Sequence, residues 1–362
     1  MRKIFLVTVG LCLAGCSDRP NPEDGGPIWP DLVLDWAVPD APRPDRALPD
    51  ISVGDRPVTE GGGPAWQSAQ VGAEDLHAVA CLPGGHLFVA GDKGTMLYRG
   101  PASPPGINFT KQSVGVSSPV TVDLYTVTFA DPTYGATAGK DWQIWETKDQ
   151  GKNWNVAPQC SAFVFEVFHS LHLSAAGAGF GAGVAVNGAG GGYKYYSGYS
   201  WVCGPTPYPG EVFLDVVRQD KLGWIVGATG GKIYRTEDEG ATWVGYAAGT
   251  TETLRAVALS GNSGLAVGDK GTIVASSDGK AWSTVTSGVT VDLYGVTLQS
   301  AQDGWAVGEG GTLLRTKDGG QSWTPQSPGV TARLEAVCFT SAMDGWAVGQ
   351  GGTVVHTITG GE

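Results

Sequence analysis

The sequence lacks the short motifs that mark several common kinds of enzyme site. It contains no Gly-x-Ser-x-Gly nucleophile elbow, no P-loop and no Rossmann fingerprint. Its six cysteines are not spaced as in a zinc site, so neither a metal nor another cofactor is expected. No stretch after residue 13 is apolar enough to span a membrane. The chain is acidic, with a net charge of −12 and no basic stripe, which argues against nucleic-acid binding.

What the sequence has instead is a pattern that recurs about every 40 residues. A full copy opens with a short apolar run, continues through Gly-Trp-Ala-Val-Gly and Arg-Thr, and ends with Asp-Gly-Gly-x-Ser-Trp. Each copy contains four strand-like runs separated by Gly and Asp clusters, which is typical of one β-propeller blade. We therefore predict an all-β, seven-bladed β-propeller with four strands per blade over 65–362. The residues that open the copies are Leu76, Leu124, Phe165, Leu214, Leu254, Leu293 and Leu334.

The last copy is incomplete, because the chain ends soon after Thr357 without a fourth strand. The missing strand has a counterpart at the start of the propeller. The Ala-Trp-Gln run at 65–67 resembles the Ser-Trp-Thr run at 322–324, which leads into the fourth strand of the preceding copy. We expect residues 65–71 to supply the outer strand of the last blade and to close the ring by hydrogen bonds between the chain ends.

The first 16 residues resemble the export signal of a bacterial lipoprotein. A short positive start and an apolar run over 4–13 lead into Leu-Ala-Gly-Cys at 13–16, the pattern at which such signals are cleaved. The resemblance implies a signal peptide over 1–15, acylation of Cys16 and attachment to the cell envelope, with Ser17 favouring the outer membrane. An ordinary secretory signal is the alternative interpretation.

Residues 16–64 are predicted to be a disordered tether between the lipid anchor and the propeller. From residue 17 onward this segment holds 10 of the 22 prolines, 10 acidic residues and 4 arginines. Such a composition, with few apolar residues and a net charge, is typical of a chain that cannot bury a core.

Four cysteines lie within the propeller, and an exported chain permits them to form disulfides. Of the three possible pairings, Cys81–Cys338 together with Cys160–Cys203 keeps both bonds between neighbouring blades. Cys160 and Cys203 are expected at opposite ends of their strands, so free buried thiols remain the alternative.

The turn before the fourth strand carries an aspartate in four copies, and it resembles the Asp-box (BNR) repeat. Such an aspartate accepts backbone N–H bonds inside its turn, and the Trp that follows packs between blades. With one per blade the aspartates lie far apart, so we assign them a structural role and no catalytic one. They are Asp149, Asp238, Asp278 and Asp318.

The end of the third strand carries Arg235, Arg315 and, in the last copy, His356. Repeated arginines on one rim are suited to gripping a carboxylate or an acidic peptide, so these residues are candidates for partner binding. Other copies have Ala275 or Glu146 at the same place. A solvated strand end that accepts many residue types is therefore the competing interpretation.

Further candidates fall on the first strands. Glu166, Asp215 and Glu335 lie at or beside the opening positions and are expected near one mouth of the central channel. Two carboxylates about 5–9.5 Å apart would suit glycoside hydrolysis. His169 and His172 are three residues apart in a predicted strand, so we expect their side chains on opposite faces and no shared metal.

The recurring Gly-Trp-Ala-Val-Gly, Arg-Thr and Asp-Gly-Gly-x-Ser-Trp segments resemble the photosystem II stability/assembly factor family, most strongly over 214–357. The resemblance implies a propeller that binds a membrane protein during assembly, without catalysis, through arginines on its surface. We therefore expect a non-catalytic, monomeric propeller, anchored in the membrane, with an unknown envelope protein as partner. The alternatives are a secreted Asp-box glycoside hydrolase or glycan-binding propeller, and a purely structural surface protein.

Overall fold

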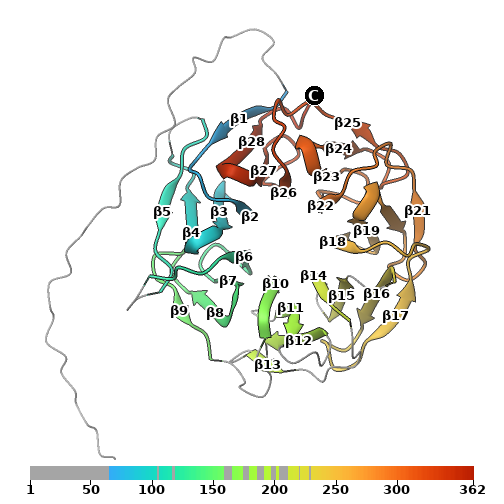
Figure 1. Cartoon of the computed structure of the whole chain (residues 1–362), viewed down its shortest axis with the longest axis horizontal. Coiled ribbons are helices and arrows are strands. Elements are labelled where there is room, and N and C mark those ends of the chain that lie inside the picture. The colour runs from blue at the N-terminus through green and yellow to red at the C-terminus, as the bar shows by residue number, and fades with distance from the viewer. Residues whose placement is uncertain are drawn as a thin grey trace, which may run out of the picture. The chain divides into compact units, whose positions relative to one another are not determined.

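The chain folds into antiparallel four-stranded sheets set around a central axis (Figure 1). In this computed structural model the described residues form 28 strands in seven such sheets. The signal peptide, the tether and Cys160 lie outside the described residues, and no helix among those described is long and apolar enough to cross a membrane. The described ranges are 65–103, 106–115, 119–158, 165–173, 179–185, 191–196, 201–203, 211–219, 221–227 and 230–362.

The sheets are numbered by the order of their inner strands along the chain. Sheet 1 contains β2 (Leu76–Leu82), β3 (His86–Gly91), β4 (Thr95–Arg99) and β5 (Thr110–Gln112). Sheet 2 contains β6 (Leu124–Phe129), β7 (Gly135–Gly139), β8 (Asp141–Thr147) and β9 (Asn155–Val156). Sheet 3 contains β10 (Phe165–Leu173), β11 (Gly179–Ala185), β12 (Gly191–Tyr196) and β13 (Trp201–Cys203). Sheet 4 contains β14 (Phe213–Gln219), β15 (Leu222–Gly227), β16 (Lys232–Thr236) and β17 (Val244–Ala247).

The remaining sheets follow the same order. Sheet 5 contains β18 (Leu254–Ser260), β19 (Ser263–Gly268), β20 (Ile273–Ser276) and β21 (Ser283–Val285). Sheet 6 contains β22 (Leu293–Leu298), β23 (Gly304–Gly308), β24 (Leu313–Thr316) and β25 (Thr324–Pro325). Sheet 7 contains β26 (Leu334–Phe339), β27 (Gly345–Gly349), β28 (Thr353–Thr357) and β1 (Gln67–Gln70). Single 3₁₀ turns between second and third strands are η1 (Asp92–Gly94), η2 (Asp269–Gly271), η3 (Glu309–Gly311) and η4 (Gln350–Gly352).

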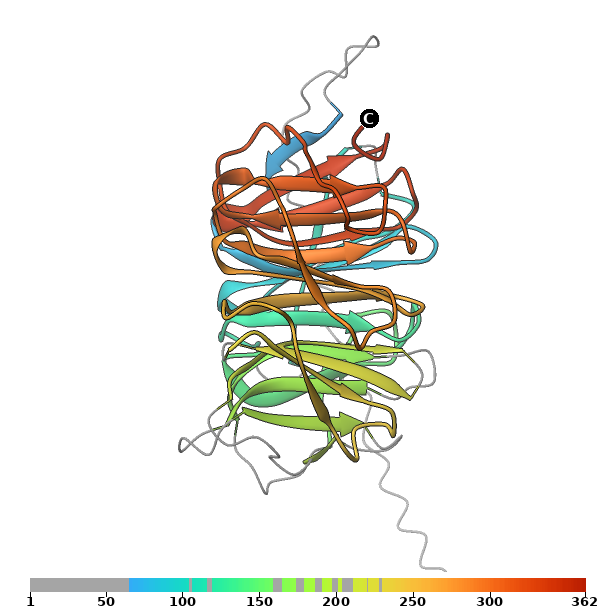
Figure 2. The ribbon, with the colours of Figure 1, turned by 90° about the vertical axis from the view of Figure 1, so that its right-hand side faces the viewer.

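The inner strands contact their neighbours in sequence order, and β26 contacts β2. This arrangement confirms the predicted β-propeller of four-stranded blades. The strands run between two opposite faces of the ring, which carry the turns (Figure 2). We call the side of η1–η4 the η face, and the side with the turns between third and fourth strands the Asp-box face.

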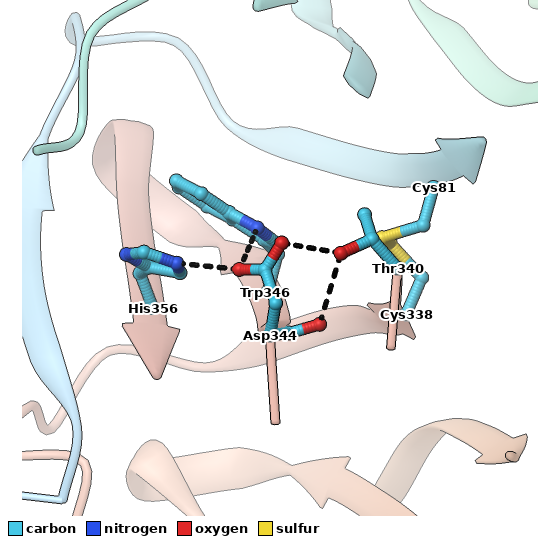
Figure 3. The surroundings of a disulfide bond; sticks show 6 residues. All are labelled: Cys81, Cys338, Thr340, Asp344, Trp346 and His356. Atoms are coloured by element: carbon cyan, nitrogen blue, oxygen red, sulfur yellow. Dashed lines mark hydrogen bonds and ion pairs between the residues drawn. A yellow bond between two sulfur atoms is a disulfide. The ribbon is translucent and has the colours of Figure 1, made fainter. Parts of the chain in front are cut away.

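The ring is closed by residues from both ends of the propeller. Strand β1 pairs with β28, from Gln67 opposite His356 to Gln70 opposite Thr353, which confirms the predicted closing strand. Beside it Trp66 is buried and meets Phe339 edge-on, with ring centroids 6.2 Å apart. A disulfide between Cys81 on β2 and Cys338 on β26 joins sheet 1 to sheet 7 (Figure 3).

Two opening residues predicted from the repeat are wrong by a small offset. Phe213 pairs with Gly227 as Leu76 pairs with Gly91, and Phe213 is the buried residue, so it opens sheet 4 in place of Leu214. In sheet 3 the fully buried residue is Phe168, three positions after Phe165. Phe213 and Leu214 are both apolar, so a spacing count does not distinguish them. Sheet 3 has a second register shift, between Phe165 and Val167, which a spacing count does not anticipate.

Packing explains the recurring Val-Gly and Trp residues. A Cβ on Gly308 would lie 2.3 Å from the carbonyl oxygen of Asp292, so this close approach of two strands requires glycine. Trp224, Trp305 and Trp346 are at most 1% exposed, so they pack inside the propeller and cannot form a carbohydrate platform.

Deleting residues 1–71 should destabilise the propeller and promote self-association, whereas deleting residues 1–64 should leave a folded monomer. The longer deletion removes Trp66, whose loss costs about 3–5 kcal/mol, and leaves the β28 edge unpaired. Light scattering after size exclusion and thermal unfolding provide the measurements. Equal melting temperatures and a monomeric mass for both truncations would show that β1 is dispensable.

Candidate functional site

The mouth of the central channel on the η face is ringed by polar and aromatic side chains. In most sheets these residues occupy the β-bulge that follows the buried opening residue of the inner strand. They line a cavity of about 480 Å³ that continues along the inner strands. We call this set the channel collar, and it consists of His77, Tyr125, His169, Arg255, Tyr294 and Glu335.

One half of the collar is a continuous chain of contacts across four sheets. His77 Nδ1 lies 2.7 Å from Glu335 Oε2, and its Nε2 lies 2.7 Å from Asp92 Oδ1. The imidazole also meets Tyr125 edge-on with centroids 5.0 Å apart, and Tyr125 stacks with His169 at 6.3 Å. The contact between His77 and Glu335 joins sheet 1 to sheet 7, so this half of the collar exists only in the closed ring.

The other half of the collar is built from paired charges around one aromatic ring. Tyr294 lies between two guanidinium groups, with Arg255 Cζ 4.8 Å and Arg333 Cζ 4.9 Å from its ring centroid. Arg333 Nε donates to Glu335 at 3.0 Å, and Arg255 pairs with Asp269. The arginines at this mouth are therefore already neutralised by carboxylates.

The two charges at the ring closure stabilise each other. Burial disfavours the imidazolium of His77, but hydrogen bonds and charges from Glu335 and Asp92 outweigh it and raise its pKa to about 9. Burial also opposes ionisation of Glu335, yet His77 and Arg333 hold its pKa below the ordinary value. At neutral pH the contact is an ion pair in a half-buried position.

Below the collar the channel wall is formed mainly by small and aliphatic side chains. The residue directly after the bulge is small in most sheets, but in sheet 4 this place holds Asp215. Asp215 Oδ1 accepts from Val216 N, and its Oδ2 accepts from Val257 N of sheet 5, both at 2.8 Å. Burial raises the pKa of Asp215 to about 6, although these bonds and one from Ser170 lower it. The equivalent residues in other sheets are Ala78, Thr126, Ala256, Gly295 and Ala336.

The carboxylates considered for glycoside hydrolysis do not form a free pair. Asp215 and Glu335 line the same channel, but strands β18 and β22 lie between their own strands. Glu335 is bound to His77 and Arg333, and Asp215 is bound to backbone N–H groups. The side chain of Glu166 lies outside the described set.

His169 and His172 have neighbours on different sheets: His169 stacks with Tyr125 of sheet 2, whereas His172 lies close to the charge of Arg218 of sheet 4. Both residues border the channel cavity. Burial lowers the pKa of His169, and burial with the nearby charge of Arg218 lowers that of His172 to about 4. Across the described ranges, no group of three His, Cys, Asp or Glu side chains is placed to hold a metal.

The candidate partner-binding residues are packed into their own sheets on the Asp-box side. Arg235 and Arg315 pair across the sheet with Trp224 and Trp305, and their Cζ atoms lie 5.2 and 5.1 Å from those indole rings. The Arg235 side chain is 9% exposed and that of Arg315 is 11% exposed. Both guanidinium groups also have carboxylate neighbours, Glu237 for Arg235 and Asp303 and Glu362 for Arg315.

His356 is held in the same manner in sheet 7 (Figure 3). Its ring stacks on Trp346 with centroids 3.7 Å apart, and its Nε2 lies 2.7 Å from Asp344 Oδ1. Asp344 also accepts from Trp346 Nε1 and from the Thr340 hydroxyl. Only a small part of His356 is left for a partner to contact.

The four Asp-box aspartates fold their own turns. Asp318 Oδ1 accepts from Ser322 N at 2.9 Å, and its Oδ2 accepts from the Ser322 hydroxyl at 2.6 Å. Asp149 and Asp238 bind Asn153 and Thr242 in the same way, while Asp278 accepts from the backbone of the shorter turn. Hydrogen bonds from Ser322 lower the pKa of Asp318 to about 2, so the carboxylate is charged throughout the physiological range.

Two features of the η face were not anticipated from the sequence. One is the collar, whose sequence signal is a large polar or aromatic residue directly after the opening apolar residue. The other is an aspartate directly before the opening residue, which accepts a backbone N–H bond from the 3₁₀ turn of the preceding sheet. These bonds run from Gly351 N to Asp75, from Lys93 N to Asp123 and from Lys270 N to Asp292.

Residues 274–362 match the family described as photosynthesis system II assembly factor YCF48. The resemblance to this family is thereby confirmed for the C-terminal part of the chain. No curated protein matches the sequence.

Solved structures share the fold along most of the propeller. A structure described as YCF48 bound to D1 peptide is 17% identical, has a TM-score of 0.65 and matches over 84% of this chain and 99% of its own. YCF48 from Cyanidioschyzon merolae is 16% identical, with a TM-score of 0.62, over 81% of this chain and 98% of its own. The GH74 enzyme of Niastella koreensis is 16% identical, with a TM-score of 0.56, over 80% of this chain and 43% of its own. At these identities the likeness concerns the fold alone.

Replacing His77 with Gln should remove a pH-dependent part of the stability. The raised pKa of His77 means that its contribution is complete below about pH 6.5 and is lost as the pH rises through about 9. The contribution is at most about 3 kcal/mol. Thermal unfolding of the wild type and H77Q between pH 6 and pH 10 measures it, and the difference between them should shrink above pH 9. A difference that does not change with pH would contradict the charged contact.

Proposed function

We propose that this protein is a non-catalytic, membrane-anchored propeller that binds a protein partner in the bacterial cell envelope. The observation that carries the proposal is the match of residues 274–362 to the YCF48 family, on a propeller that resembles a YCF48 bound to a peptide. The export and lipidation pattern ending at Cys16 supports the envelope location. A monomer on a long tether would reach a partner in the same membrane.

The site geometry favours binding over hydrolysis. A glycosidase needs two free carboxyl groups on either side of a substrate bond, and Asp215 and Glu335 are engaged and set apart by two inner strands. The carboxylates of the Asp-box turns accept hydrogen bonds from residues of their own turns. The glycosidase or glycan-binding alternative rests on fold similarity to a GH74 enzyme and on no described site.

The rim around Arg235 and Arg315 is the predicted contact for the partner, and the structure defines what this rim offers. The guanidinium groups are mostly covered, while neighbouring Glu237 and Glu362 are more than half exposed. A purely acidic peptide would meet these carboxylates as well as the arginine tips. We therefore propose a partner segment of mixed charge, which pairs with both.

Replacing Arg235 and Arg315 together with Met should reduce partner capture at least about tenfold. Methionine keeps an apolar cover over Trp224 and Trp305, so the blades stay packed while the charges are removed. Chemical cross-linking followed by affinity purification from the native membranes measures the captured partner.

The matched control replaces Lys93 and Lys270 with Met, because these exposed cations lie on the opposite η face. Capture that survives in R235M/R315M but falls in the control would move the partner site to the η face. If the wild type captures no partner above an untagged background, the binding function itself is wrong.

Replacing Cys16 with Ala should abolish lipid attachment and release the protein from the membrane fraction. Acylation requires the thiol at this position. Among the described residues, no helix is long and apolar enough to cross a membrane. Metabolic labelling with an alkyne-tagged fatty acid, read together with membrane fractionation, tests this. Labelling that persists in C16A would exclude Cys16 as the acylated residue.

A further inference from the structure

Asp215 is a charged residue at a position that small, uncharged residues occupy in the other sheets. The places equivalent to it in five other sheets hold alanine, glycine or threonine, paired to the second strand in the same register. A carboxylate here faces the channel cavity, where the neighbouring wall is formed by valines and alanines. The repeat itself therefore does not require a charge at this position.

The hydrogen bond by which Asp215 links two sheets does not require a charge either. In sheet 2 the hydroxyl of Thr126 accepts from Leu171 N of sheet 3 at 3.0 Å. Asp215 Oδ2 makes the same kind of bond to Val257 N of sheet 5 at 2.8 Å. A neutral threonine thus links neighbouring sheets as well as the aspartate does, and the negative charge adds a desolvation cost without serving this link.

No cation of the described structure compensates this charge. Among the described residues, no Lys, Arg or His side chain lies within ion-pair distance of Asp215. Arg255 is paired with Asp269 and Asp292, and His77 is paired with Glu335 and Asp92. His169 and His172, which face the same cavity, are neutral at neutral pH because burial lowers their pKa values.

We propose that the central channel binds an alkylammonium group, such as a lysine side chain, with the ammonium at Asp215. The charge-assisted contact supplies the cation that Asp215 lacks. The methylene chain then lies along the aliphatic wall, which includes Val257 and Val296. The cavity of about 480 Å³ accommodates such a group, and the site is independent of the rim around Arg235.

The test uses n-butylamine hydrochloride as the free probe, and a capped pentapeptide with a central lysine between glycines as the peptide probe. The matched neutral probes are n-butanol and the same peptide with norleucine in place of lysine. Binding is followed at pH 7.5 by the backbone amide signals of Val216 and Val257 in NMR spectra of the mature protein. We expect saturable shifts with at least one amine probe and none with its neutral counterpart.

The decisive variant is Asp215→Thr, which copies sheet 2 and keeps the link between sheets while removing the charge. We expect it to weaken amine binding about tenfold or more, since the charge-assisted hydrogen bond to the ammonium is lost. Glu309→Gln, which removes an exposed charge from the same face, is the control and should bind as the wild type does. Asp215→Asn provides a second neutral variant should D215T unfold, as judged by circular dichroism.

Each outcome decides the proposal. Shifts with either amine probe support it when they are lost in D215T or D215N. Shifts with the lysine peptide alone identify a peptide as the source, and shifts with n-butylamine alone identify a small amine. Equal binding by the wild type and the neutral variants would overturn it, as would the absence of saturable shifts with either amine. Partner capture through the rim arginines is unaffected by these results, so the two proposals fail separately.

Discussion

Closure of the ring between sheet 1 and sheet 7 is the constraint on which the rest of the structure depends. Residues from the two ends of the propeller meet there in two ways. Strand β1 pairs with β28, and a disulfide joins Cys81 to Cys338, which lie 257 positions apart in the sequence. A cross-link over so long a loop contributes about 5 kcal/mol in the chain-entropy description. The contact of His77 with Glu335 spans the same junction, so the channel collar is a property of the closed ring.

The elements that follow from local chemistry could be predicted from the sequence. The period of the repeat predicts the blades, and the Asp-Gly turns predict where the third strands end. The closing strand could be found because the last copy lacks a segment that the chain start supplies. These features depend on neighbours within one copy or on a direct comparison between copies.

The remaining features depend on contacts that spacing does not encode. A second register shift in sheet 3 leaves Phe168 as its buried opening residue, and two adjacent apolar residues conceal that Phe213 opens sheet 4 in place of Leu214. The burial of Arg235 follows from its cross-strand partner Trp224, and a sequence pattern shows only that an arginine recurs. The sequence therefore overstates how exposed the rim arginines are, and it does not predict the collar.

In a propeller built from similar copies, the residues that differ between copies are the candidates for a function of their own. The aspartate before an opening residue binds the preceding turn in three sheets, but Arg333 stands at this place in sheet 7 and contacts Tyr294 and Glu335 instead. Asp215 departs from the small residues of its ring in the same way. The charge of Asp215 carries a desolvation cost, and its equivalents in other sheets are uncharged. Both departures lie at the channel and its η-face mouth, which is why we place the proposed ligand on this axis.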